Sequence, residues 1–170
     1  MSSPTIGDPH ILDPGHAPTP FTAAAIRSGC PAGRTIRLSV ERSGQPTYVR
    51  VNRFVSTDAE GAVQQSQNFT IEGAELTSPE TSRATWLDLQ RHASFPRDRT
   101  RIDEETIALP VGGLECLRYT VTDEEMVQIF WFALEKPGMP VKFISREHDV
   151  VTSSVTMISD VIEGKTVGGS

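Results

Sequence analysis

Short segments with apolar residues at alternate positions recur along most of this chain, and tight turns separate them. Residues 34–43 show the pattern clearly, because Ile36, Leu38 and Val40 alternate with polar neighbours. A period of two is typical of a strand with one buried face. The same reasoning predicts eight strands, at residues 34–43, 47–55, 62–71, 100–109, 114–121, 126–134, 141–145 and 150–158.

The connections between these segments are short, and short connections force neighbouring strands to run antiparallel. Residues 43–46, 112–113 and 137–140 have the glycines and prolines that turns require. A long antiparallel sheet twists and curls. We therefore expect an α+β fold that is mostly antiparallel β: a curved half-barrel sheet of about eight strands with one helix on its concave face.

That helix is predicted at residues 78–92, between the third and fourth strands. A serine N-cap, a proline in the first turn and a glutamate near the positive end of the helix dipole favour a start at residues 78–80. Trp86 and Leu89 then share an apolar face that can pack on the sheet. A shorter, alanine-rich helix is predicted at residues 21–27.

The 170 residues fit one domain. Five prolines within residues 1–20 disfavour helix and sheet there. We expect a flexible or surface-pinned arm at residues 1–20, a single β-rich domain at residues 21–163 and a frayed tail at residues 164–170.

The net charge of −6 and the scattered basic residues disfavour a nucleic-acid partner. No secretion signal and no apolar run of membrane-spanning length are present, so a cytoplasmic location away from membranes is expected. Cys30 and Cys116 are too few for a disulfide scaffold and are interpreted as reduced thiols.

Three runs in the second half resemble a known pattern: residues 114–121 (LECLRYTV), 129–133 (IFWFA) and 137–141 (PGMPV). Over residues 100–160 the chain is similar to LolA-like curved half-barrel domains and related domains of unknown function. The resemblance implies an open, curved sheet that encloses an apolar cavity, with a helix as its lid. It provides no functional residue that can be transferred.

The favoured hypothesis is a non-catalytic module that binds a small apolar ligand or a partner protein without a cofactor or metal. Large rings and a few polar groups between helix and sheet would line the binding site. Residues 62–71 add Gln65 and Gln67, which share the parity of the apolar residues and are expected to face inward. The predicted ligand-binding residues are Trp86, His92, Arg118, Tyr119 and Trp131.

Two alternatives remain open at this point. Asp88 and His92 lie four residues apart on the predicted helix, and a carboxylate that orients an imidazole is half of a general-base arrangement. The chain would then be a cofactor-free isomerase, cyclase or hydrolase that acts in the same cavity. The other alternative is an assembly protein that uses a sheet edge, or the arm, to bind partners or further copies of itself.

Overall fold

The computed structural model describes residues 7–162 of the chain. Within this range, nine strands form a single antiparallel sheet. The strands are β1 (Arg34–Arg42), β2 (Tyr48–Thr57), β3 (Gly61–Thr70), β4 (Glu80–Thr85), β5 (Thr100–Leu109), β6 (Gly112–Asp123), β7 (Met126–Ala133), β8 (Lys142–Glu147) and β9 (Val150–Ile162). The expected mostly antiparallel, curved sheet is confirmed, with one more strand than the sequence indicated.

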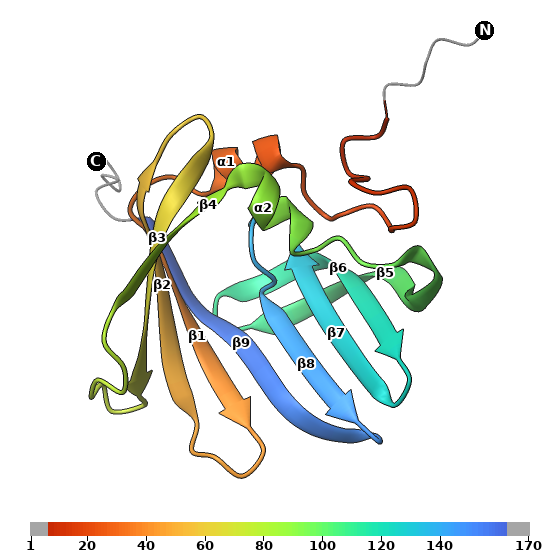
Figure 1. Ribbon diagram of the computed structural model, residues 1–170. Helices are drawn as coiled ribbons and strands as arrows, with labels where there is room; N and C mark the ends of the chain where they lie inside the picture. Colours follow the sequence, from red (N-terminus) through yellow and green to blue (C-terminus); the bar gives the residue numbers. More distant parts are fainter. Residues whose placement is uncertain (1–6, 163–170) are drawn as a thin grey trace, which may run out of the picture.

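The sheet consists of two meanders that meet at β1 and β9. Its strand order is β4-β3-β2-β1-β9-β8-β7-β6-β5, so β1 pairs with β9 although more than a hundred residues separate them. Strands β4 and β5 form the two edges and do not pair with each other. The sheet therefore stays open and curls into a half-barrel (Figure 1).

Local irregularities increase the curvature of the sheet. The pairing register shifts between Arg37 and Leu38 in β1, and again between Phe54 and Ser56 in β2. A third shift lies in β8, next to Ser145. An extra residue on one strand bends it and increases its twist, so these positions help the long strands to wrap around a concave face.

The prediction of one helix at residues 78–92 is wrong for the first half of that range. Residues 80–85 form β4, which pairs with β3 along six registers from Gly61 to Ser66. The helix α2 (Trp86–Arg91) begins only after that strand. Its N-cap is Thr85, whose hydroxyl accepts a hydrogen bond from the Asp88 amide in a capping box. The ladder to β3 and this cap together outweigh the cap that Ser78 would provide.

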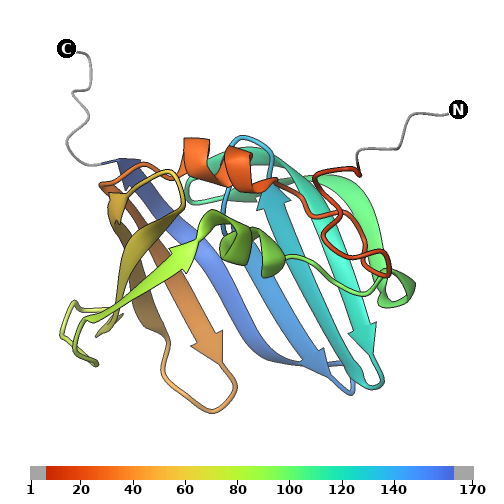
Figure 2. The same cartoon turned by 45° about the horizontal axis from the view of Figure 1, so that its top comes forward.

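Two further short helices occur among the described residues. The first, α1 (Ala23–Gly29), is close to the predicted helix and begins at Thr22, whose hydroxyl accepts from the Ala25 amide at 3.1 Å. A 3-10 turn, η1 (Arg97–Arg99), leads into β5. Helices α1 and α2 contact each other and lie over the concave side of the sheet at one end of the half-barrel (Figure 2). No helix in residues 7–162 has the length and apolar character needed to cross a membrane.

Residues 7–20 lie against the domain next to α2. The amide of Ala17 donates to the carbonyl of Phe95 at 2.8 Å, and the side chain of Gln90 donates to the carbonyl of Pro9 and the hydroxyl of Thr19. The first six residues of the predicted arm, and the predicted tail at 164–170 together with residue 163, lie outside the described range.

Candidate functional site

A cavity of about 280 Å³ lies between the concave face of the sheet and the two helices. Its walls are mostly apolar and come from α1, β1, β2, β3, α2, β7 and the loop between β7 and β8. The apolar side chains that define it include Ile26, Ile36, Phe54, Leu89, Ala93 and Phe132. A water molecule occupies ~30 Å³ in the liquid, so the space is several water molecules in size.

The cavity is present because α2 brings little side-chain volume over this part of the sheet. The helix has only six residues and turns Leu89 toward the cavity, and the small Ala93 follows its C-cap. Its largest side chain, Trp86, lies elsewhere: the indole N–H donates to the carbonyl of Asp58 at 2.9 Å. A longer helix with a large residue at position 93 would fill the space.

The other half of the concave face is filled by the chain's own aromatic rings. Phe95 stacks on Phe130 with ring centroids 4.9 Å apart, and Tyr119 packs edge-on against Phe132 at 5.3 Å. The Tyr119 hydroxyl donates to the carbonyl of Pro18 at 2.7 Å, so residues 7–20 cover this region. Burial raises the pKa of Tyr119. The hollow therefore lies between these β7 rings, which form one wall, and strands β1, β2 and β3.

Two amide side chains lie in the wall of the cavity, Asn52 from β2 and Gln64 from β3. Both are half-buried, and no hydrogen bond joins either side chain to another residue in the described range. The sequence predicted Gln65 and Gln67 to face inward, but strand alternation puts them on the face opposite Gln64, and Gln67 donates to the carbonyl of Thr77.

A buried ion pair closes the cavity at the end of α1. The Arg34 guanidinium forms two parallel hydrogen bonds with the Asp160 carboxylate, and it also donates to the carbonyls of Gly29 and Pro137. The nitrogen that donates to these two carbonyls, Nη1, also lies 3.2 Å from the sulfur of Cys30, so its two hydrogens are shared among three acceptors. Although Arg34 lines the cavity, its charge is already neutralised by Asp160. Its role is therefore to stabilise the wall, and its guanidinium is not available to a ligand.

Cys30 lies in the same wall as a fully buried thiol. Burial raises its pKa, and the neighbouring Arg34 only partly offsets that effect. Cys116 is buried too, and burial together with the charge of Glu105 raises its pKa to about 11. A nucleophilic cysteine needs a lowered pKa and access to solvent, so neither thiol has the properties of a nucleophile.

Of the five predicted ligand-binding residues, His92 is the one that lines the cavity. It is the C-cap of α2, exposed at the rim. Its predicted partner Asp88 is engaged elsewhere: the carboxylate accepts from the Thr85 amide at 3.2 Å and pairs with Arg91. Hydrogen bonds from Thr85 lower the pKa of Asp88. The His92 amide donates to the Asp88 carbonyl at 3.3 Å, but no hydrogen bond joins the Asp88 carboxylate to the His92 imidazole among the described contacts, so the predicted acid–base arrangement is not formed.

Arg118 and Trp131 lie on the outer face of the sheet instead of the inner one. They are directly opposite each other on β6 and β7, and both contact Glu105: Arg118 at 3.2 Å and the indole N–H of Trp131 at 2.8 Å. The amine of Lys142 lies 5.5 Å from the centre of the Trp131 ring. These contacts make a polar cover over Trp131 and leave neither residue facing the cavity.

Sequence reasoning missed most residues that form the cavity. Asn52 lies in a strand without a clear polar–apolar alternation, and Ala93 is inconspicuous because it is small. Gln64 faces inward, on the same side of β3 as the buried Ala62. The apolar Val63 and Phe69 lie on the opposite face and suggested the wrong parity.

Comparison with known proteins adds little to this geometry. No protein-family model matches the sequence, and no curated protein sequence matches it. Among solved structures, the chain is similar to a protein from Bacteroides fragilis with a YmcC-like fold, thought to be exported. The sequences are 9% identical, the match covers 78% of this chain and 98% of that one, and the TM-score is 0.49. Likeness at this level transfers neither a ligand nor an activity.

Proposed function

We propose that this chain is a non-catalytic binding module that holds a small, largely apolar ligand between the concave face of its sheet and α2. The observation that carries the proposal is the unfilled, mostly apolar cavity of about 280 Å³ between the helices and the sheet. Folded proteins fill their interiors closely, so an opening of this size beside unpaired amides is typical of a ligand site.

The energetics favour an apolar occupant. Water in this space finds few hydrogen-bonding partners, because Asn52, Gln64 and His92 are the main polar side chains that remain available in the wall. Replacing such water with an apolar group gains about 25 cal/mol for each Å² of apolar surface removed from solvent. The same wall offers no arrangement for proton transfer or nucleophilic attack, which is why binding is preferred over catalysis.

The test uses the uncharged fluorescent probe N-phenyl-1-naphthylamine and the alcohol dodecanol. Wild-type protein should enhance the probe's fluorescence saturably, and dodecanol should displace the probe and raise the melting temperature, because a ligand that binds only the folded state stabilises it. Ala93→Phe places a ring in the cavity and should lose most of the probe binding, as should Leu89→Phe.

The matched control is Ala108→Phe, which adds the same ring at an exposed position on edge strand β5. It should bind the probe as wild type does. Circular dichroism and a melting curve for every variant separate a filled cavity from a failure to fold. Absence of saturable probe binding to the wild-type protein, with no thermal shift from dodecanol, would contradict the proposal.

A further inference from the structure

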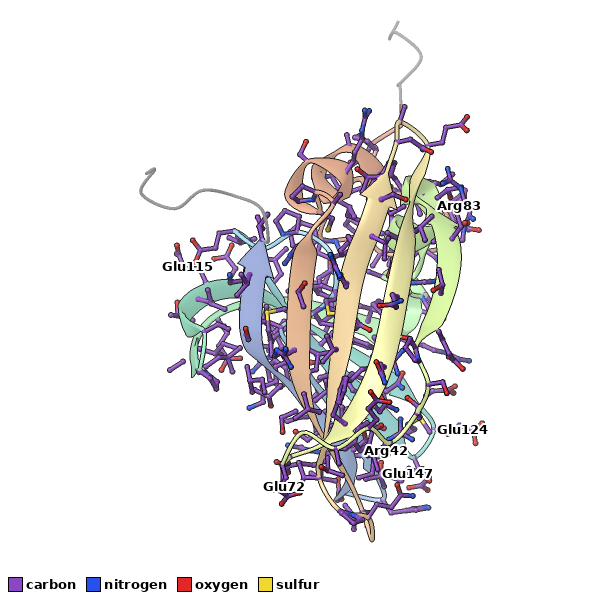
Figure 3. All side chains as sticks on the ribbon, turned by 90° about the vertical axis from the view of Figure 1, so that its left-hand side faces the viewer. Arg42, Glu72, Arg83, Glu115, Glu124 and Glu147 are labelled. Atoms are coloured by element: carbon purple, nitrogen blue, oxygen red, sulfur yellow. The ribbon has the colours of Figure 1, made fainter. Side chains whose placement is uncertain are left out.

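The cavity continues along the concave face toward the end of the half-barrel that lies away from the helices. A second hollow of about 410 Å³ adjoins it, and Asn52, Gln64 and Met139 line both spaces. Beyond these shared residues, the second hollow is lined by the apolar Leu38, Val40 and Val155 and by polar side chains that include Arg42 and Arg50. Figure 3 shows Arg42 at the end of the sheet opposite the helices.

Neither Arg42 nor Arg50 has an acidic partner among the residues that the structure describes. This distinguishes them from most of the chain's other arginines, which pair with carboxylates. Such pairs are formed by Arg34 with Asp160, Arg83 with Asp58, Arg91 with Asp88, Arg99 with Asp123, Arg101 with Asp103, and Arg118 with Asp103 and Glu105. A half-buried guanidinium at position 50, facing a hollow without a counter-charge, is available to a ligand.

The charge around these arginines contrasts with the protein as a whole. The chain has 22 acidic residues and a net charge of −6, yet neither hollow has an aspartate or glutamate in its lining. A cleft that has charges of one sign and apolar walls concentrates the electrostatic potential within it. The open end of the groove is therefore positive on an otherwise acidic protein, which favours an anion.

The order of these groups along β2 gives the length of the site. Arg50, Asn52 and Phe54 follow one another on the concave side of the strand, with Phe54 in the apolar cavity and Arg50 in the open hollow. Four residues of an extended strand span roughly 13 Å. A ligand that fills the site thus extends over about this length, with its apolar part beside Phe54, neutral contacts midway and its charge at the Arg50 end.

Accepting the proposed binding function, we infer that the ligand is an anionic amphiphile. Its unbranched apolar chain lies in the cavity beneath α2, and its carboxylate or phosphate group binds Arg50 with Arg42 beside it. A guanidinium group presents several N–H donors in a planar fork, and this geometry matches the oxygens of both a carboxylate and a phosphate. The amides of Asn52 and Gln64 hydrogen-bond neutral oxygen or nitrogen atoms near the head group.

The experiment measures displacement of N-phenyl-1-naphthylamine by four probes that share a twelve-carbon chain: dodecanoate, dodecyl phosphate, dodecanol and dodecyltrimethylammonium, each below its micellar concentration. The two anions should bind more tightly than the alcohol, and the cation should bind most weakly. The stronger of the two anions identifies the oxyanion. Added salt should weaken binding of the anions and leave dodecanol unaffected.

Arg50→Gln should weaken dodecanoate binding roughly ten-fold or more, since hydrogen bonds to charged groups are the stronger class, and should leave dodecanol unchanged. Arg42→Gln should have a smaller effect in the same direction, because its side chain is exposed. The control is Arg37→Gln, which removes the same charge from the outer face of β1 and should alter neither.

The outcomes separate this inference from the function on which it rests. Equal binding of dodecanoate and dodecanol, or an equal loss of both in Arg50→Gln, overturns the anionic head group while an apolar ligand remains. Preferred binding of the cation overturns it as well. If the naphthylamine probe itself fails to bind, the binding function is lost and this inference with it.

Discussion

Arg34 and Asp160 form a buried, two-point ion pair across β1 and β9, with nitrogen–oxygen distances of 2.9 and 3.0 Å. The pair joins the two meanders of the sheet at the strand contact where residues most distant in sequence meet. Lys136 adds a third hydrogen bond to the same carboxylate at 3.1 Å. The side chains of Arg34 and Asp160 are only 3% and 9% exposed, so each charge depends on the other for its stabilisation.

Asp160→Asn should lower the free energy of unfolding by about 3 kcal/mol, because it leaves the Arg34 guanidinium buried without a counter-charge. Urea denaturation measures the effect. The matched control is Asp123→Asn, which removes an equivalent carboxylate from the exposed pair with Arg99 and should change stability by less than about 1 kcal/mol. Similar effects of the two substitutions would contradict a structural role for the buried pair.

The contribution of the Arg34–Asp160 pair to the free energy of unfolding should depend on pH. Burial alone would raise the pKa of Asp160, but the hydrogen bonds and charges of Arg34 and Lys136 outweigh it and leave the pKa lowered. A carboxylate with a lowered pKa in the folded state stabilises the fold above the pKa of the unfolded chain, about 3.9. That stabilisation is lost as the pH falls through the folded-state value.

The gap in unfolding free energy between wild type and Asp160→Asn should therefore be constant above about pH 5 and shrink as the pH falls below 4. Denaturation series at several pH values measure it. A gap that stays unchanged down to pH 2 would show that protonation of Asp160 does not contribute to acid unfolding.

The start of α2 can be tested with a pair of caps. Thr85→Ala removes the hydroxyl that accepts from the Asp88 amide, and should cost about 1 kcal/mol of stability. Ser78→Ala should cost less than about 0.5 kcal/mol, because Ser78 is exposed and precedes β4 instead of a helix. A larger loss of stability in Ser78→Ala than in Thr85→Ala, measured by thermal denaturation, would contradict this helix start and support the longer helix that the sequence predicted.

Gln90 provides a test of how residues 7–20 are held. Its amide donates to Pro9 and Thr19, and its oxygen accepts from the Ala23 amide at 2.9 Å. Gln90→Leu removes these three hydrogen bonds, one of which is to the buried Thr19, and should cost about 2 kcal/mol. Limited proteolysis should then cleave within residues 7–20 sooner than in wild type.

Gln45→Leu makes the same substitution in an exposed turn and serves as the control for that comparison. It should leave both the stability and the cleavage rate near wild-type values. Equal rates of cleavage in Gln90→Leu and wild type would mean that other contacts, such as the Tyr119 hydroxyl to Pro18, are sufficient to hold the segment.

Alternation was sufficient to predict most strands because their buried faces are regular. Ile36, Leu38 and Val40 are buried as expected, and the strand predicted at 126–134 is observed at Met126–Ala133. Strand β4 was missed because its residues are polar and nearly all exposed. It is stabilised by backbone pairing with β3, which leaves no hydrophobic pattern in the sequence.

The site was harder to predict because it depends on side-chain direction. Strand β7 has apolar residues on both faces, so nothing in the sequence indicates that Phe132 faces inward and Trp131 outward. The bulge in β2 displaces its inward positions by one residue relative to β3. His92 lies beside the hollow because it is the C-cap of α2.

Strands β4 and β5 do not pair, so the volume enclosed by the sheet is not determined by barrel closure. In a closed barrel, the number and stagger of the strands determine the diameter, so capacity cannot be altered without new pairing throughout. Here a six-residue helix spans the mouth instead. Adding a turn to α2, or replacing Ala93 with residues of graded size, can therefore change the volume of the cavity without altering the pairing of any strand.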